Sequence, residues 1–202
     1  MSERMPVYIL AGGRSTRFGS DKARAVIHGQ PLILHAANAV ARFATRCTAV
    51  AAIPDQYADL GLPTIADSIP NAGPLGGLVR ALSDLTDEDR LLLVSCDLVL
   101  YDVEPVAQLL RAAAGTHGAA AFYTNCWQPM PGVYARRLIP QTEALLQRGD
   151  GSLARLLDLQ GLAVPIESWD EVALDVNTPE ALLRAETLVR LRVGEVTTPI
   201  PC

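Results

Sequence analysis

The sequence predicts an α/β protein in which a mostly parallel central sheet is flanked by helices on both faces, a three-layer α/β/α arrangement. Apolar runs alternate with helix-periodic segments along the 202-residue chain. Runs such as Leu91–Val94 are apolar at every position, as in strands that are buried on both sides. Hydrophobic residues make up 50% of the chain, enough for a sizeable core. The length predicts one domain, residues 1–195, and the Pro- and Thr-containing end at 196–202 predicts a flexible tail.

The expected strands are short apolar runs that lie between turn-forming residues. In chain order they are Val7–Leu10, Thr48–Ile53, Leu91–Ser95, Ala119–Tyr123, Gly132–Tyr134, Ala163–Ile166 and Ala173–Val176. The expected helices have apolar residues at helical spacing, and the last has an N-cap threonine followed by proline and glutamate. They are Leu32–Phe43, Leu75–Leu85, Val103–Ala114, Ile139–Gln147, Ser152–Leu159 and Pro179–Leu191.

Charge and cysteine usage exclude several classes of function. A net charge of −5 argues against general nucleic-acid binding, so any anion site must be a local basic patch. The four cysteines form no C-x-x-C pair and have no clustered histidines, which argues against a zinc site and a disulfide framework. We expect reduced, buried thiols. Residues 1–6 contain no apolar signal core and no apolar run is long enough for a membrane span, so we expect a cytoplasmic protein.

The segment after the first expected strand is rich in glycine and basic residues. Glycines allow backbone N–H groups to approach a ligand closely, and such a turn forms a concave anion site. Arg17 and Lys22 add positive charge beside it, which suits a nucleoside triphosphate. The glycine spacing matches neither the dinucleotide fingerprint nor the P-loop.

Asp97 follows the expected strand Leu91–Ser95, so its carboxylate should face the same region as the glycine-rich segment. There it can bind Mg²⁺, a cation held by one or two carboxylates together with substrate phosphates. The structural alternative, that Asp97 caps the next helix, is weaker because Asp102 is the better N-cap.

Two further segments carry polar groups beside expected strands. Asp67 precedes Gly73-Pro74 and a helix start that contains Gly76 and Gly77. These two glycines are poor helix formers, which suggests close approach of a base or ribose. Asp175 and Asn177 alternate along the last strand, so their side chains should share one face and could complete a metal site.

The motif L-A-G-G-x-x-x-R-F-G-x-D-K resembles that of sugar-nucleotide-type nucleotidyltransferases, and most closely that of the molybdenum cofactor guanylyltransferases. The resemblance extends through four motifs and implies a Rossmann-like nucleotidyltransferase fold. It implies Mg²⁺, GTP and molybdenum-bound molybdopterin, with transfer of GMP to the acceptor phosphate. The implied catalytic residues are Arg17, Lys22 and Asp97, and the implied metal ligands are Asp97, Asp175 and Asn177. The implied nucleotide-binding residues are Leu10, Ala11, Gly12, Gly13, Lys22, Asp67, Gly73 and Asp97.

The sequence departs from the family pattern at three places. The usual C-D-x-P continues here as Leu98-Val99-Leu100, the usual histidine of H-P-x-x-x-x-Y is Gln128, and the first asparagine of N-x-N-T-P-E is Asp175. Two alternatives therefore stay open: a nucleotidyltransferase that uses CTP or another phosphorylated acceptor, and a non-catalytic nucleotide-binding chaperone of molybdoenzymes. Expected protein partners are transient, from molybdopterin synthesis or molybdoenzyme maturation.

Overall fold

The computed structural model describes residues 4–11, 21–67, 69, 72–100, 104–115, 118–169, 173–176, 178 and 180–187. Its strands are β1 Met5–Leu10, β2 Val26–Ile27, β3 Gln30–Pro31, β4 Ala44–Ala51, β5 Thr64–Ala66, β6 Arg90–Ser95, β7 Leu98–Leu100, β8 Ala119–Tyr123, β9 Trp127–Ala135, β10 Gly161–Pro165 and β11 Ala173–Asp175. Its α-helices are α1 Leu32–Val40, α2 Gly73–Ser83, α3 Glu104–Ala113, α4 Ile139–Gln147 and α5 Leu153–Gln160, and residues 180–187 are also helical. The 3₁₀ turns are η1 Lys22–Arg24, η2 Ala41–Phe43, η3 Ala58–Leu60 and η4 Arg136–Leu138.

Within the described residues the main sheet has the strand order β10-β8-β9-β6-β1-β4-β5. Every neighbouring pair is parallel except the two pairs made by β9, which runs antiparallel to β6 and β8. The predicted mostly parallel sheet is therefore confirmed. The antiparallel β9 was not predicted, because apolar periodicity carries no information about strand direction.

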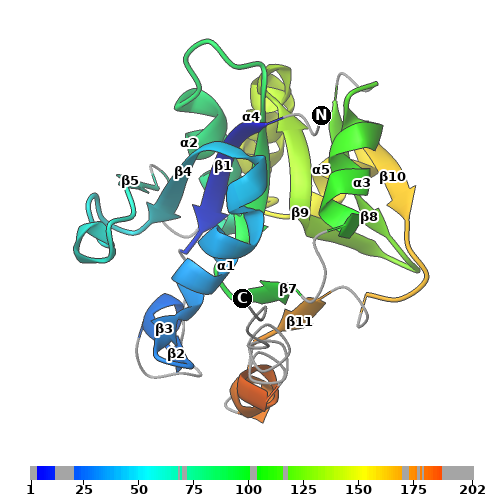
Figure 1. The fold of residues 1–202 in the computed structure, drawn as a ribbon. Coiled ribbons are helices and arrows are strands. Elements are labelled where there is room, and N and C mark those ends of the chain that lie inside the picture. Colours follow the sequence, from blue (N-terminus) through cyan, green and yellow to red (C-terminus); the bar gives the residue numbers. More distant parts are fainter. Residues whose placement is uncertain are drawn as a thin grey trace.

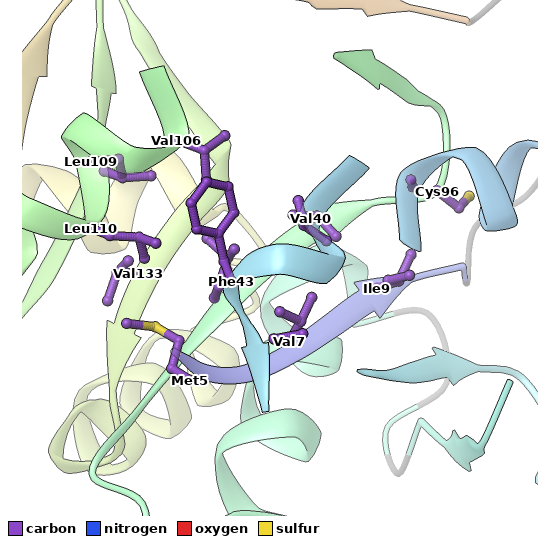
Figure 2. Close-up of a cluster of buried hydrophobic side chains, with 14 of the residues drawn as sticks. Met5, Val7, Ile9, Val40, Phe43, Cys96, Val106, Leu109, Leu110 and Val133 are labelled. Carbon is purple, nitrogen blue, oxygen red and sulfur yellow. The ribbon is translucent and has the colours of Figure 1, made fainter. Parts of the chain in front are cut away.

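Helices cover both faces of this sheet, with α1 and α3 in front of it and α4 behind it in Figure 1. Alternate residues of β1 enter the two cores: Val7 and Ile9 pack with α1 and α3, whereas Tyr8 and Leu10 pack with α2, α4 and α5. Figure 2 shows the first core, where the Phe43 ring points toward Val106 of α3. All these side chains are buried, which confirms the three-layer prediction.

A smaller unit lies beyond the ends of the parallel strands, in the lower part of Figure 1. The β2–β3 hairpin and the antiparallel pair β7–β11 bury a small shared core, which includes Ile27, Val99 and Val176. Strands β2, β3, β5 and β7 were not predicted from the sequence. Each is three residues or shorter, too short for a periodicity to be seen.

The bounds of several elements differ from the prediction. Strand β4 ends at Ala51, not at Ile53, and the Ile53 side chain is 59% exposed. Strand β9 extends to Trp127, well before the predicted start at Gly132. The predicted tail at 196–202 lies outside the described residues. Within the described part of the chain, every helix is too short or too polar to span a bilayer.

The cysteines only partly follow the prediction of buried thiols. Cys96 is buried and burial raises its pKa to about 12, whereas Cys47 is half-buried and has a pKa raised by burial to about 11. Cys126 is exposed, so the prediction is wrong for this residue. All three are free thiols, and Cys202 lies outside the described residues.

Candidate active site

The candidate site lies at the carboxyl edge of the sheet, defined here as the edge where β1, β4 and β6 end at Leu10, Ala51 and Ser95. The backbone is well anchored there. The Ala11 amide donates to the Val50 carbonyl at 2.9 Å, and the Cys96 amide donates to the Leu10 carbonyl at 3.0 Å. The chain segments that leave β1 and β6 therefore begin side by side. This is the place where open α/β sheets bind their ligands.

Lys22 and Asp97 meet at this edge. The Lys22 ammonium Nζ lies 2.6 Å from Asp97 Oδ2, and the side chains are only 13% and 21% exposed. The second Asp97 oxygen accepts a hydrogen bond from the Ser95 hydroxyl. The structure thus brings two of the three predicted catalytic residues into contact. The third, Arg17, lies outside the described residues, as do Gly12 and Gly13.

Asp97 is not a helix cap. It is followed at once by β7, and α3 begins only at Glu104. The Leu98-Val99-Leu100 departure from the family pattern forms this strand, whose backbone pairs with β11. A proline within it could not donate a ladder hydrogen bond. The departure therefore has a structural explanation that leaves the Asp97 carboxylate at the carboxyl edge.

The turn that carries Lys22 is held from its first residue. Asp21 is the N-cap of η1, and its Oδ1 accepts from the Ala23 amide at 3.0 Å. The same carboxylate accepts from the Tyr57 hydroxyl and from Gln56 Nε2. Asp21 belongs to the quoted motif but was assigned no role from the sequence, and Gln56 and Tyr57 were not predicted as site residues. The N-cap residue type was a usable signal for Asp21, whereas no local pattern pointed to Tyr57.

The predicted nucleotide-binding residues Asp67 and Gly73 line one small hollow at this edge together with Leu10. The Asp67 amide donates to the Ala51 carbonyl at 2.7 Å, and its Oδ1 accepts from the Ile69 amide at 3.1 Å. Gly73 has φ +66°, a conformation that favours glycine, and an added Cβ would lie 3.2 Å from the Gly151 carbonyl oxygen. Asp67 thus supports the turn into α2 as well as facing the hollow.

Gly76 and Gly77 both have close protein neighbours, and Gly77 also lines the small hollow, so their contact with a ligand stays a prediction. A Cβ at Gly76 would lie 2.6 Å from the Ala72 Cβ, and one at Gly77 would lie 2.8 Å from Leu10 Cδ2. Both distances are below normal van der Waals contact. These glycines allow α2 to lie close to its own first turn and to β1, a packing requirement that sequence alone did not distinguish from ligand binding.

Asp175 ends β11 and is paired with Leu98, the residue after Asp97. The backbones touch, since the Val176 amide donates to the Asp97 carbonyl at 2.9 Å. One Asp175 carboxylate oxygen accepts from the Trp169 indole at 3.4 Å, and Asn177 lies outside the described residues. Among the described residues no three His, Cys, Asp or Glu side chains cluster as a metal site. Metal binding by Asp97, Asp175 and Asn177 stays a prediction.

A larger cavity of about 690 Å³ opens beside the small hollow and shares Gly73 and Pro74 with it. Its walls are the start of α2, Pro129 and Met130 of β9, and the segment 149–154, which joins α4 to α5 and includes the first two residues of α5. Because β9 runs antiparallel to β6 and Gly132 pairs with Leu93, the first residues of β9 lie at the carboxyl edge. The volume suits a small organic molecule.

These features define an α/β nucleotidyltransferase fold, and solved structures share it. A crystal structure of molybdopterin-guanine dinucleotide biosynthesis protein A from Archaeoglobus fulgidus superposes with a TM-score of 0.75 at 21% identity, over 92% of this chain and 99% of that one. A glucose-1-phosphate thymidylyltransferase structure from Bacillus anthracis, described as putative, superposes with a TM-score of 0.70 at 16% identity, over 92% of this chain and 95% of that one. At these identities the likeness shows the fold.

The chain belongs to the MobA-like NTP transferase domain family, whose model matches residues 7–164. Relatives named molybdenum cofactor guanylyltransferase include one from Pseudomonas putida strain KT2440, 34% identical over 87% of this chain and 94% of its own length. The one from Pseudomonas entomophila is 32% identical over 91% of this chain and 100% of its own. A probable guanylyltransferase from Nostoc is also 32% identical, over 86% of each chain.

Proposed function

We propose that this protein is a molybdenum cofactor guanylyltransferase, which transfers GMP from GTP to the phosphate of molybdenum-bound molybdopterin and releases pyrophosphate. The observation that carries the proposal is the contact between Lys22 and Asp97 at the carboxyl edge. At this edge an ammonium can bind the negatively charged phosphates of a magnesium nucleotide, and a carboxylate can bind its Mg²⁺ ion. The names of the relatives support a guanylyl group as the group transferred and the molybdenum cofactor as the acceptor.

The nucleotide would lie across the ends of β1 and β4. We assign the base to the small hollow lined by Leu10, Asp67 and Gly77. We assign the triphosphate to the backbone amides that follow Ala11, including those of Gly12 and Gly13, with Lys22 beside them. L-A-G-G rather than L-A-A-G in this segment favours GTP over CTP through the family resemblance.

The chemical step needs positioning and charge stabilisation rather than covalent catalysis. An oxygen of the acceptor phosphate attacks the α-phosphorus of GTP, a new P–O bond forms, and the bond to the β-phosphate oxygen breaks. The electron pair leaves with pyrophosphate. Lys22 and Arg17 would neutralise negative charge on the phosphates during this exchange. The catalytic assignments of Arg17, Lys22 and Asp97 belong to this proposal.

Asp97 would hold Mg²⁺, with Asp175 or Asn177 as the second protein ligand. The fit rests on the donor set: the Asp97 carboxylate already holds a cation, the Lys22 ammonium, at 2.6 Å. When bound, Mg²⁺ supplies Lewis-acid polarisation of the phosphate oxygens. The Ser95 hydroxyl, which donates to the other Asp97 oxygen, fixes the orientation of the carboxylate.

The acceptor would occupy the larger cavity. Its volume of about 690 Å³ and its position between α2 and the start of β9 suit a second organic substrate beside the nucleotide. The reaction would take place in the cytoplasm, where GTP is available and cysteines stay reduced. Transient contact with proteins of molybdopterin synthesis or with molybdoenzyme chaperones is part of the same proposal.

The test is pyrophosphate release in the presence of Mg²⁺ and molybdenum-loaded molybdopterin, with GTP, CTP and ATP compared side by side. Release with GTP alone is expected. A preference for CTP would overturn the choice of base while leaving the reaction class intact. Silence with every nucleotide, together with measurable GTP binding, would contradict the proposal and favour another acceptor or a non-catalytic binder.

A further inference from the structure

Tyr57 is a buried tyrosine whose hydroxyl lies close to both Ala11 and Asp21, the residues on either side of 12–20. The side chain is 0% exposed. Its hydroxyl oxygen lies 3.1 and 3.2 Å from the two carboxylate oxygens of Asp21, and 3.5 Å from the carbonyl oxygen of Ala11. A phenol has one proton, and the shorter, charge-assisted bond to Asp21 is the stronger one. Tyr57 is therefore tied to the turn that carries Lys22.

Asp21 links the Tyr57 hydroxyl to the η1 turn, because its carboxylate bonds to both. One of its oxygens caps η1 through the Ala23 amide at 3.0 Å, and the other accepts from Gln56 Nε2 at 3.0 Å. The next residue in the chain is Lys22, whose ammonium contacts Asp97 at 2.6 Å. A continuous path of short contacts thus joins the buried phenol, the cap, the lysine and the proposed metal ligand.

The other end of η1, at Arg24, packs against residues 56–59. The Arg24 guanidinium lies 5.3 Å from the centre of the Tyr57 ring, donates to the Gln56 carbonyl at 2.6 Å, and pairs with Asp59 at 2.8 Å. A short 3₁₀ turn has little stability of its own. Its conformation therefore depends on residues 56–59, and Tyr57 is the only buried member of that segment.

We infer that Tyr57 is a positioning residue for the reaction: its hydroxyl holds Asp21, and through Asp21 the turn that places Lys22 beside Asp97 and the triphosphate. The inference rests on the proposed nucleotidyl transfer. The phenol stays a proton donor across the physiological range, because burial and the nearby Asp21 charge raise the pKa of Tyr57. Catalysis by a positioned charge is sensitive to displacements of about 1 Å, which can cost about 100-fold in rate.

The chain offers a matched control in Tyr8. This tyrosine is also 0% exposed, and its hydroxyl also donates to a carboxylate, that of Asp84 at 2.8 Å. Asp84 follows the last residue of α2, whereas Gly73 at the start of α2 lies at the carboxyl edge, so this contact lies at the other end of α2 from that edge. Tyr8→Phe and Tyr57→Phe therefore remove the same chemical group from equally buried places.

The experiment compares kcat and KM for pyrophosphate release with GTP, together with the thermal midpoint, in wild type, Tyr57→Phe and Tyr8→Phe. Tyr57→Phe should lower kcat by about 10- to 100-fold. Tyr8→Phe should also lower the midpoint but leave kcat within about twofold, because the Tyr8 hydroxyl bonds to Asp84 and Arg46, away from the carboxyl edge. A kcat for Tyr57→Phe within twofold of wild type would overturn the inference.

A double variant separates positioning from a general loss of structure. If Tyr57 acts through Lys22, Tyr57→Phe should cause no further loss of kcat in a Lys22→Ala background, although it should still lower the midpoint. An equal loss of kcat in both backgrounds would overturn the inference. GTP dissociation constants are measured for wild type, Tyr57→Phe, Lys22→Ala and the double variant. They test, without turnover, whether Tyr57 affects GTP binding through Lys22. A wild type that binds GTP but releases no pyrophosphate would contradict the proposed function, and the binding data would still decide the role of Tyr57.

Discussion

The Lys22 ammonium lies 2.6 Å from the Asp97 carboxylate, although 75 positions separate the two residues in the chain. The contact joins the turn after β1 to the end of β6, the two strands at the centre of the main sheet. In the unliganded protein the two opposite charges form a salt bridge with each other. In the proposed mechanism, a magnesium nucleotide would separate this pair, with the metal bound to the Asp97 carboxylate and a phosphate bound to the Lys22 ammonium.

Removing either charge of this pair should abolish most of the activity. Lys22→Ala and Asp97→Asn should each lower kcat by about 100- to 1,000-fold, the range found when a single group that stabilises transition-state charge is lost. Pyrophosphate release measures the effect, and circular dichroism checks the fold. Arg111→Ala is the control, since it breaks an exposed ion pair with Glu104 on α3. Full activity in Asp97→Asn would remove this residue from the mechanism.

The same two residues should be energetically coupled in the unliganded protein. A double-mutant cycle of Lys22→Ala and Asp97→Ala, followed by urea unfolding, should give a coupling free energy of about 0.5–3 kcal/mol, as for other residues in contact. Additive effects would mean that the contact at 2.6 Å contributes nothing measurable to stability. High salt should reduce the coupling only slightly, because both side chains are largely shielded from solvent.

Substitutions at Asp67 separate its structural role from its proposed contact with the nucleotide. Asp67→Asn keeps an oxygen that can accept from the Ile69 amide, whereas Asp67→Ala removes it. We expect unchanged stability for Asp67→Asn and a loss of about 1 kcal/mol for Asp67→Ala, the usual net value of one hydrogen bond. Both should raise KM for GTP. A wild-type KM in Asp67→Asn would show that the carboxylate charge is not used on the nucleotide.

Gly76→Ala should destabilise the protein, contrary to the usual effect of Gly→Ala inside a helix. Alanine normally gains about 0.5–1 kcal/mol over glycine in a helix. At Gly76 the new methyl group would lie 2.6 Å from the Ala72 Cβ, and overpacking of this kind costs about 1–3 kcal/mol. Gly115→Ala is the control, because its nearest neighbour would be 4.0 Å away. Urea unfolding measures both, and a gain in stability for Gly76→Ala would refute the packing argument.

The thiols should differ in reactivity in an order set by burial. The pKa of Cys96 is raised to about 12 and that of Cys47 to about 11, so both remain protonated thiols at pH 8. Of the three described thiols, exposed Cys126 should therefore react first with iodoacetamide, as followed by peptide mass spectrometry. A thiol whose pKa is raised by folding stabilises the folded state below its unfolded pKa. This contribution should disappear as the pH rises from about 9 toward 12. Fast alkylation of Cys96 at pH 8 would contradict the prediction.

Much of the fold was predictable because it depends on local patterns. The bounds of β8 and α4 match the prediction at both ends, since each is a run of apolar or helix-periodic residues between clear breaks. The alternation of such runs predicted the mostly parallel sheet, and the structure confirms it. The short strands β2 and β7 were missed because two or three residues show little periodicity, and both strands form by pairing with another strand. The equally short β11 was predicted, as part of the longer run Ala173–Val176.

The sequence by itself determined which residue types stand beside the ends of β1 and β6, and hence that Lys22 and Asp97 were candidates. Only the tertiary structure decided that the two are in contact, that Gly76 and Gly77 serve packing, and that Tyr57 holds Asp21. The physical reason is the range of the interactions. Periodicity and capping act within one turn or strand, whereas contacts between residues 36 or 75 positions apart exist only after the parallel strands have aligned their ends.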